Sequence, residues 1–307
     1  MILVSVGTHT QPFNRLLEKI DELIGKGILK EKLIAQIGNS TYVPKNYEYF
    51  TFVSEKKIQE LNKKANIIIT QAGAGSIITA LKYKKKIIVV PRLKKFNEHV
   101  NDHQVQIAKI FEKQRKVLVC YDINDLDKIL RKIKKFKPKF KNEKPKMLKI
   151  IKRFFGKRKI KVCIICSAGG HLIEAMQLSP VFSRYKHYFL TIEREQSKEL
   201  LKNKKVFYIL DPRRNPIKVL INLFQAFRIF MREKPDVIIS TGAGIAIPTC
   251  YIGKLFGSKI IFVESIAAVT KPSLSGRFAY PVADLFIVQW DGLLSFYRKA
   301  VYGDQLI

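Results

Sequence analysis

The sequence predicts an α/β protein with two Rossmann-like parallel-sheet units in tandem. Short apolar runs, typical of strands buried on both faces, alternate with segments of helical spacing along the whole chain. The alternation begins again at Lys161, after a strongly basic stretch. The 307 residues are enough for two ordinary domains, each with its own core.

The first half, residues 1–138, is predicted to form one domain around five strands. The first strand, Ile2–Val6, precedes a helix over Phe13–Ile24, in which apolar residues recur three or four positions apart. The four remaining strands are Leu33–Ile37, Ile67–Thr70, Ile87–Val90 and Val117–Val119. Helical patterns between them predict a parallel sheet with helices on both faces.

Residues 139–158 are predicted to form a basic linker. The stretch 132–161 holds fifteen Lys or Arg residues and one acidic residue, Glu143, and Pro138 and Pro145 interrupt regular structure. Met147–Phe155 has the spacing of a short basic amphipathic helix, which suits the anionic face of a membrane. A solvated linker is the equally weighted alternative.

The second half, residues 159–307, is predicted to form another parallel-sheet domain. Its strands are Val162–Cys166, Tyr188–Thr191, Val206–Ile209, Val237–Ser240, Ile260–Val263 and Leu285–Val288. Lys218–Arg232 is predicted to be an amphipathic helix with basic ends. It either lies in a membrane surface or faces the core of its own domain.

Composition narrows the function classes. The chain has 57 Lys and Arg against 25 Asp and Glu, a net charge of +32 that attracts nucleic acid, anionic bilayers or nucleotide phosphates. No nucleic-acid motif is recognised, so nucleic acid is not expected as a partner. No apolar run reaches the roughly 18 residues of a spanning helix, and the first residues predict a strand rather than a signal peptide.

The four cysteines are predicted to be buried thiols. Cys163 and Cys166 have a C-x-x-C spacing, but residues three apart on a strand point to opposite faces. This arrangement favours packing over metal or redox use and fits a reducing compartment.

Three glycine-rich loops follow predicted strands, where ligands of doubly wound sheets bind. The first, Gln71–Ser76, places backbone N–H groups and a helix dipole where a diphosphate can bind, although a simple tight turn is the alternative. The second, Ser167–His171, brings a histidine to the start of a helix, and the third is Ser240–Gly244. Neither the dinucleotide fingerprint nor the P-loop occurs, which disfavours hydride transfer and ATP hydrolysis.

A polar cluster, Glu98–Gln104, follows the strand Ile87–Val90. His99 and His103 are four apart and would share one face of a helix, as in some metal sites, but no cysteine or third histidine lies nearby. We therefore assign no metal and no cofactor, and expect the cluster to bind sugar hydroxyls instead.

Both halves resemble parts of one family of glycosyltransferases. The first half is similar to the catalytic subunit of the two-part eukaryotic enzyme that adds the second N-acetylglucosamine to dolichyl-diphosphate-N-acetylglucosamine, and to bacterial exopolysaccharide counterparts. The motifs are Val6–Thr8, Gln11–Leu16, Ala72–Ser76 and Asn101–Gln104. The second half is similar to the membrane-anchored partner subunit, through Ser167–His171, Pro235–Asp236, Ser240–Gly244, Val263–Ser265, Ser273–Arg277 and Val288–Trp290.

The resemblance implies a GT-B fold, in which two Rossmann-like domains face each other across a cleft. It implies a donor domain in 1–138 and a membrane-associated acceptor domain in 159–307, fused with the donor half first. One departure is clear: the glycine loop begins with Gln71, where the family usually has histidine.

The resemblance also implies roles for individual residues. His171 is the expected general base, because imidazole titrates near neutrality. The expected donor-binding residues are Gly7, Thr8, Gln71, Gly73, Ala74, Gly75, Ser76, Asp102, His103 and Gln104. The expected acceptor-binding residues are Gly169, Gly170, Thr241, Gly242 and Glu264, the last of which is equally well a buried structural group.

The expected function is an inverting, metal-independent transfer of N-acetylglucosamine or another hexose or uronic acid from a UDP-sugar to a polyprenyl- or dolichyl-diphosphate-linked sugar, in glycan or exopolysaccharide biosynthesis. The partners are then the UDP-sugar, the lipid-linked acceptor and an anionic membrane, with peripheral attachment at its cytoplasmic face. A UDP-sugar 2-epimerase of the same fold and a non-catalytic scaffold for another transferase are the alternatives.

Overall fold

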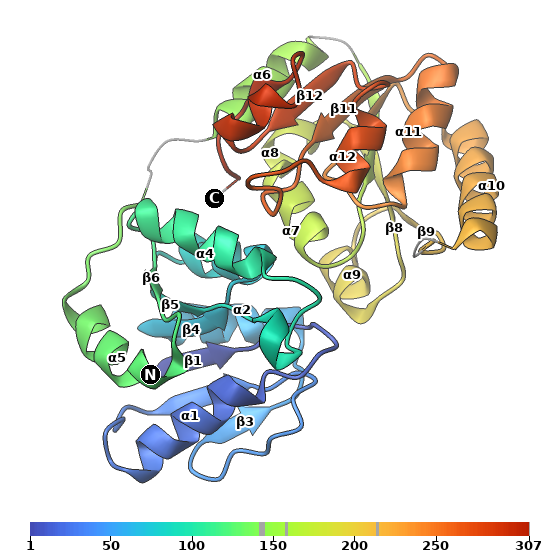
Figure 1. The fold of residues 1–307 in the computed structure, drawn as a ribbon. Coiled ribbons are helices and arrows are strands. Elements are labelled where there is room, and N and C mark those ends of the chain that lie inside the picture. The colour runs from blue at the N-terminus through green and yellow to red at the C-terminus, as the bar shows by residue number, and fades with distance from the viewer. Residues whose placement is uncertain (141–144, 157–158, 213–214, 307) are drawn as a thin grey trace. The chain divides into compact units, whose positions relative to one another are not determined.

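The computed structural model describes residues 1–140, 145–156, 159–212 and 215–306. Packing divides the chain into two compact units, Met1–Asn142 and Glu143–Ile307, each built on one sheet (Figure 1). Every strand pairing in both sheets is parallel. The predicted pair of Rossmann-like parallel-sheet domains is therefore confirmed.

The first sheet has six strands in the order β3-β2-β1-β4-β5-β6. Their bounds are β1 Ile2–Ser5, β2 Leu33–Gln36, β3 Glu48–Phe50, β4 Ile67–Gln71, β5 Lys86–Val90 and β6 Leu118–Val119. The chain winds outward from β1 to β3 and then returns to β4 on the other side of β1. The strand order therefore reverses between β1 and β4, the place where doubly wound sheets bind ligands.

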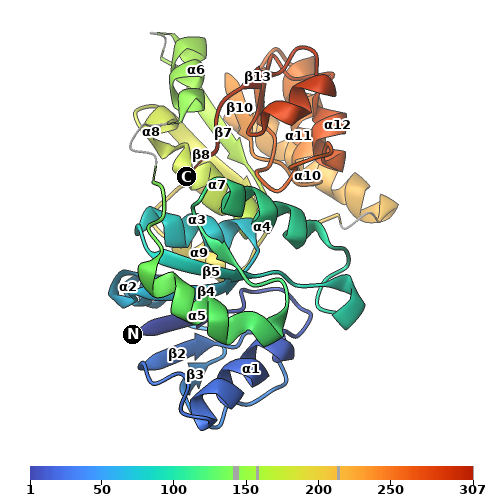
Figure 2. The same ribbon diagram turned by 60° about the vertical axis from the view of Figure 1, so that its left-hand side comes forward.

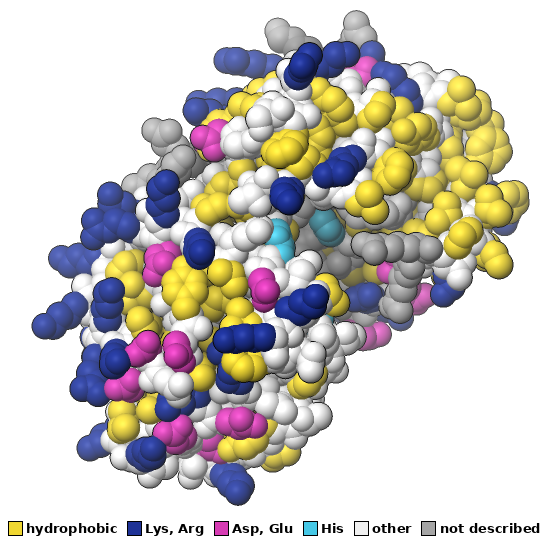
Figure 3. Space-filling view, viewed as in Figure 1, with side chains coloured by type: hydrophobic (Ala, Val, Ile, Leu, Met, Phe, Trp, Pro, Cys, Tyr) yellow, Lys and Arg dark blue, Asp and Glu magenta, His cyan; other side chains and the backbone are white. Residues whose placement is uncertain are grey.

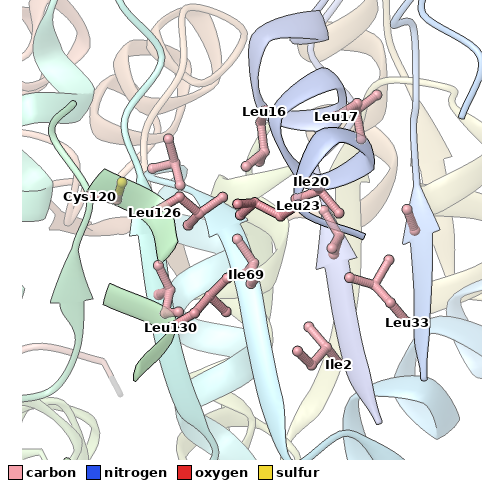
Figure 4. Packing of buried hydrophobic residues seen from close by; sticks show 14 of the residues in the cluster. Ile2, Leu16, Leu17, Ile20, Leu23, Leu33, Ile69, Cys120, Leu126 and Leu130 are labelled. Atoms are coloured by element: carbon pink, nitrogen blue, oxygen red, sulfur yellow. The ribbon is translucent and has the colours of Figure 1, made fainter. Parts of the chain in front are cut away.

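Helices cover both faces of the first sheet. They are α1 Asn14–Gly25, α2 Glu55–Lys64, α3 Ala74–Lys82, α4 His103–Lys113 and α5 Leu126–Lys135, with short 3₁₀ turns η1 Lys94–Phe96 and η2 Ile123–Asp125. Helices α1 and α5 pack on one face, where Leu16, Leu17 and Leu130 lie with Ile2 and Ile69 in one core (Figures 2 and 4). Strand residues such as Leu3 and Ile68 are buried too, which explains the unbroken apolar runs.

The second sheet has seven strands in the order β13-β12-β11-β10-β7-β8-β9. Their bounds are β7 Lys161–Ile165, β8 Lys186–Thr191, β9 Val206–Tyr208, β10 Val237–Ser240, β11 Lys259–Val263, β12 Leu285–Val288 and β13 Val301–Tyr302. The same winding recurs, with the reversal between β7 and β10. All six predicted strands are present, and β13 is an addition at the edge.

Two separate cores flank the second sheet. The helices are α6 Lys146–Phe155, α7 Gly170–Gln177, α8 Ser179–Phe182, α9 Glu195–Leu200, α10 Pro216–Glu233, α11 Ala246–Leu255 and α12 Leu274–Ala279, followed by a 3₁₀ turn, η3 Asp291–Ser295. Residues of α6, α7 and α8 pack on one face, and residues of α10 and α11 on the other. Cys166 belongs to the first core and Cys163 to the second, so the two thiols lie on opposite faces as predicted.

The stretch predicted as a basic linker contains helix α6, which corrects that assignment. The helix has the predicted amphipathic pattern, but its apolar side is already covered. Met147, Leu148, Ile151 and Phe155 are buried in the core of the second unit, and the N–H of Met147 donates to the carbonyl of Gly303 at 2.8 Å. The apolar face of α6 is therefore part of the protein interior and is not available to a membrane.

Helix α10 differs from α6, because most of its apolar side faces solvent instead of the core. Its buried side consists of Asn222, Ala226, Phe230 and Glu233, and packs on α11. Its outer side is apolar and exposed over Ile217, Leu220, Phe224, Phe227 and Met231, which recur at helical spacing. Neither sequence alternative describes it fully, because the helix packs on its own domain and still presents an apolar stripe to solvent. No helix in the described part of the chain combines the length and hydrophobicity needed to cross a bilayer.

The burial of α6 predicts that Ile151→Ala destabilises the second unit. Ile151 is fully buried, and truncating such a side chain costs about 2–5 kcal/mol. The only tryptophan, Trp290, lies buried in the second unit, so its fluorescence during urea unfolding measures this unit. Lys149→Ala, at an exposed position of the same helix, is the control. Equal losses for the two variants would contradict the burial of α6.

Candidate functional site

The first candidate site lies where β1 and β4 end beside each other. Gly7 follows β1 with φ +75°, and Gly73 precedes helix α3. The side-chain amide of Gln71, the last residue of β4, lies against both glycines, because a Cβ at either position would overlap its Nε2. This close approach is the physical reason for glycine at both positions. Thr8 is exposed beside them.

The first turn of α3 supplies backbone donors at the same edge. Ala74, Gly75 and Ser76 form that turn, and the first bond within the helix runs from the N–H of Ile77 to the carbonyl of Gly73, at 3.1 Å. The three preceding amides therefore have no partner inside the helix. Amides in this position, together with the helix dipole, bind phosphate groups. The predicted glycine loop thus has the local geometry of an anion site.

Arg92, which the sequence analysis did not single out, holds the loops around this site. It directly follows β5 and Pro91 and is buried, with its guanidinium 4.8 Å from the ring centroid of Phe13. At 2.7–3.1 Å the guanidinium donates to the carbonyls of Val6, Gln11, Pro12 and Glu98. Burial lowers the pKa of Arg92 to about 10, which still leaves it charged near neutral pH. A charged residue directly after a buried strand was the available sequence signal.

The three residues expected to hold a donor sugar lie in different environments. The exposed carboxylate of Asp102 accepts from the N–H of Lys94 at 2.8 Å. His103 begins α4 and is half-buried. Gln104 is only 5% exposed, and both ends of its amide are hydrogen-bonded inside the first unit. Its expected contact with a sugar is corrected to an internal contact, because the helix turns this side chain toward the glycine loop.

His99 and His103 do not share a helix. His99 lies in the turn before α4, where its Nδ1 is 3.0 Å from the carbonyl of Asn101 and its ring centroid is 4.9 Å from that of His9. The spacing of four residues therefore does not bring the two histidines to one helical face.

The second candidate site lies where β7 and β10 end beside each other. His171 is the second residue of α7, after Gly169 at φ +90° and Gly170. Its Nδ1 lies 2.8 Å from the carbonyl of Thr241, and the Thr241 hydroxyl donates to the carbonyl of His171 at 2.8 Å. These reciprocal bonds join two loops that are 70 residues apart in the chain.

The bond to Thr241 fixes the tautomer of His171. A carbonyl only accepts, so Nδ1 carries the hydrogen and Nε2 keeps its lone pair. The ring is half-buried. Burial lowers its pKa below the ordinary value, and the bond to Thr241 opposes this effect only in part. The imidazole is therefore neutral near pH 7, with Nε2 able to accept a proton.

Gly242 lies against the histidine ring. A Cβ there would lie 3.0 Å from Cε1 of His171 and 3.2 Å from Nδ1, and its φ of +111° strongly favours glycine. The structure thus brings four of the expected acceptor residues together around His171: Gly169, Gly170, Thr241 and Gly242.

Glu264, the fifth, is a buried structural group. It has no exposed surface, and its carboxylate accepts from the N–H of Ser265, the N–H and hydroxyl of Ser273 and the hydroxyl of Tyr297. Of the two alternatives left open by the sequence, the structure therefore supports the structural one.

A second buried carboxylate extends this network. Glu174 of α7 accepts from Ser265 Oγ at 3.0 Å, from the N–H of Ile266 at 3.2 Å and from Gln289 Nε2 at 2.8 Å. Burial raises the pKa of Glu174 to about 8. The network ties the helix that bears His171 to the loops after β11 and β12.

Two protein families match this chain, one in each half. The glycosyltransferase family 28 C-terminal domain matches residues 1–159, and the family described as oligosaccharide biosynthesis protein Alg14 like matches residues 147–306. Each match covers more than half of the 307 residues.

Individual relatives are similar to the second half. UDP-N-acetylglucosamine transferase subunit ALG14 of Rattus norvegicus is 27% identical over 176 residues, which cover 47% of this chain and 82% of that protein. The same subunit of Candida albicans is 40% identical over 98 residues, or 30% of this chain and 44% of that protein. Among solved structures, MurG of Acinetobacter baumannii is similar with a TM-score of 0.39 and 21% identity, over 43% of this chain and 42% of that one.

The close contact at Gly242 predicts that Gly242→Ala moves the His171 ring. The added methyl group displaces the imidazole from the Thr241 carbonyl into water, so the pKa of His171 should rise toward its ordinary value. An alanine at this φ also costs about 1–3 kcal/mol. Gly244→Ala, in the same loop with no atom nearer than 4.0 Å to its added Cβ, is the matched control. NMR titration of the histidine ring protons measures the shift. An unchanged pKa in a folded Gly242→Ala protein would contradict the contact.

Proposed function

Since this chain belongs to the glycosyltransferase family 28 C-terminal domain family through residues 1–159 and to the Alg14-like family through residues 147–306, we propose that it transfers a sugar from a UDP-sugar to a lipid-diphosphate-linked sugar. It is a glycosyltransferase with the two doubly wound domains of the GT-B class. N-acetylglucosamine is the first donor to consider, because the relatives are named for its transfer.

One observation carries this proposal: each family-matched half has its candidate site at the reversal of its strand order. The first unit has glycine turns and unpaired helix amides suited to a diphosphate. The second has a neutral histidine whose Nδ1 is bonded and whose Nε2 therefore carries the lone pair. The two sites supply the two functions that the transfer needs, stabilisation of a leaving diphosphate and removal of a proton.

In this mechanism the acceptor hydroxyl attacks the anomeric carbon and gives its proton to Nε2 of His171. The bond from that carbon to the diphosphate oxygen breaks, and UDP leaves. The amides of Ala74–Ser76 and the dipole of α3 stabilise the charge that develops on the diphosphate. Direct attack on the face opposite the leaving group inverts the anomeric configuration, and this charge stabilisation does not require a metal.

Peripheral attachment to the cytoplasmic face of a membrane completes the proposal. Hydrophobic side chains gather over α10 and α11 on the right of Figure 3. The stripe of α10 continues onto the end of α11, where Leu255 is 80% exposed and the next residue, Phe256, packs on Phe227. Four exposed cations border α10: Lys218, Arg228, Arg232 and Lys234. An apolar stripe bordered by cations fits the headgroup region of an anionic bilayer.

A donor panel tests the transfer. Purified protein is incubated with radiolabelled UDP-N-acetylglucosamine, UDP-glucuronic acid, UDP-galactose or UDP-glucose and a polyprenyl-diphosphate-sugar acceptor, with and without a chelator. Label is expected in the lipid phase with one donor and is expected to be unaffected by the chelator. His171→Ala should lower the rate about 10²–10⁴-fold, the usual contribution of a general base.

His187→Ala is the matched control for that loss, because His187 lies on β8 and its Nδ1 bonds the carbonyl of Tyr185. UDP release without label in the lipid would favour an epimerase or hydrolase. Absence of both turnover and donor binding would leave the scaffold alternative and overturn the proposed transfer.

Flotation with anionic liposomes tests membrane attachment. Leu220 and Phe224 are 65% and 68% exposed, so Leu220→Glu with Phe224→Glu should leave the fold intact. Fully burying a large apolar side chain contributes about 1.5–3 kcal/mol, so the double variant should bind about tenfold more weakly or worse. Ile28→Glu with Val43→Glu makes the same charge change at exposed apolar positions of the first unit. Equal flotation of the two double variants would rule out the α10 stripe as the membrane contact.

A further inference from the structure

The side chain of Gln104 is held in one orientation by two backbone amides. Its Oε1 accepts from the N–H of Ala72 at 3.1 Å and from the N–H of Arg92 at 3.0 Å. A backbone N–H only donates, so the atom that receives both bonds is the carbonyl oxygen of the side chain. The Nε2 of Gln104 must then point the other way. There it donates to Oε1 of Gln71.

This bond determines the orientation of the next amide. Because Gln71 accepts through Oε1, its Nε2 points away from Gln104, toward Gly7 and Gly73. Gln71 is only 8% exposed, so its hydrogen bond to Gln104, rather than water, sets the orientation of the amide. An N–H group is therefore directed to the place where β1 and β4 end, next to the first amides of α3.

We propose that Gln104 is a positioning residue, which orients Gln71 so that the Gln71 Nε2–H donates to an anionic oxygen of the bound nucleoside diphosphate. The inference rests on the proposed function and specifies how its donor site recognises charge. A reversed Gln71 would present a carbonyl oxygen to the same anion and repel it. Arg92 belongs to the same arrangement, because its backbone holds Gln104 while its guanidinium holds the loop after β1.

An uncharged donor has a consequence for pH. A primary amide does not titrate near neutrality. The contribution of Gln71 to diphosphate binding is therefore constant with pH in the range where a histidine in its place would change charge. The preference for an anion is instead set by the orientation of the Gln71 amide. The two backbone N–H groups orient Gln104, and Gln104 orients Gln71.

Calorimetric titration of the full chain with UDP tests the inference through Gln104→Glu. The carboxylate keeps both acceptor contacts but cannot donate, so Gln71 should turn to donate to it and present Oε1 to UDP. The dissociation constant at pH 8 should rise about tenfold or more relative to the wild-type chain, the typical effect of losing a hydrogen bond to a charged group. In the Gln71→Met background the same change should weaken UDP binding no further, because the donor that it reorients is already absent.

Two further variants separate positioning from damage to the fold. Gln106→Glu adds the same charge on the exposed side of α4 and should bind UDP like the wild-type chain. Gln71→Met removes the N–H itself and should weaken binding by a similar factor at every pH. Gln71→Met also tests the inference if circular dichroism shows that Gln104→Glu does not fold at pH 8. Wild-type affinity for UDP in Gln71→Met would then overturn the inference.

The results also distinguish this inference from the proposed function. A wild-type chain that does not bind UDP would overturn the donor site and everything built on it. A wild-type chain that binds UDP, together with a folded Gln104→Glu protein of equal affinity at pH 8, would overturn the positioning role alone. A Gln104→Glu protein that is weakened in the wild-type background and not in the Gln71→Met background, beside an unaffected Gln106→Glu protein, is the expected result.

Discussion

The reversal of strand order in each parallel sheet is the constraint on which both candidate sites depend. At β1 and β4, and again at β7 and β10, the chain leaves two neighbouring strands in opposite directions, which is where doubly wound sheets bind ligands. This arrangement brings Gly7 to Gln71 in the first unit and His171 to Thr241 in the second. The strand order therefore determines where each candidate site lies, and the side chains determine what the site can do there.

Buried polar networks then hold the loops at these edges. In the first unit, Arg92 and Gln104 satisfy backbone groups of loops that a sheet cannot pair. In the second, Glu174 and Glu264 do the same for the loop after β11. A buried polar group left without a hydrogen bond costs more free energy than a formed hydrogen bond contributes. Removal of one residue of such a network should therefore destabilise all the loops that the network holds. Gln104 and Glu264, which the sequence suggested as ligand-binding residues, for this reason stabilise loops from inside the protein.

The sequence was most informative where one physical cause dominated. Strands buried on both faces need continuous apolar runs, which made the inner strands predictable, whereas β3 was missed because Glu48 and Tyr49 are exposed. The glycine turns were predictable because backbone geometry requires those residues. The roles of Gln104 and Glu264 were not, because a polar side chain has the same sequence signature whether it faces a ligand or the interior. The basic stretch obscured α6 for a related reason: its pattern indicates an amphipathic helix, and only the tertiary structure shows what covers the apolar side.

The outward-facing stripe of α10 gives the folded chain an amphiphilic surface. Folding normally removes apolar surface from water, but here a rigid helix keeps Ile217, Leu220 and Phe224 exposed, and each square ångström left in water costs about 25 cal/mol. That free energy is released at any interface between water and a less polar phase. We therefore expect adsorption to air bubbles and vessel walls to compete with the dissolved state, and mild detergent to raise the recoverable concentration.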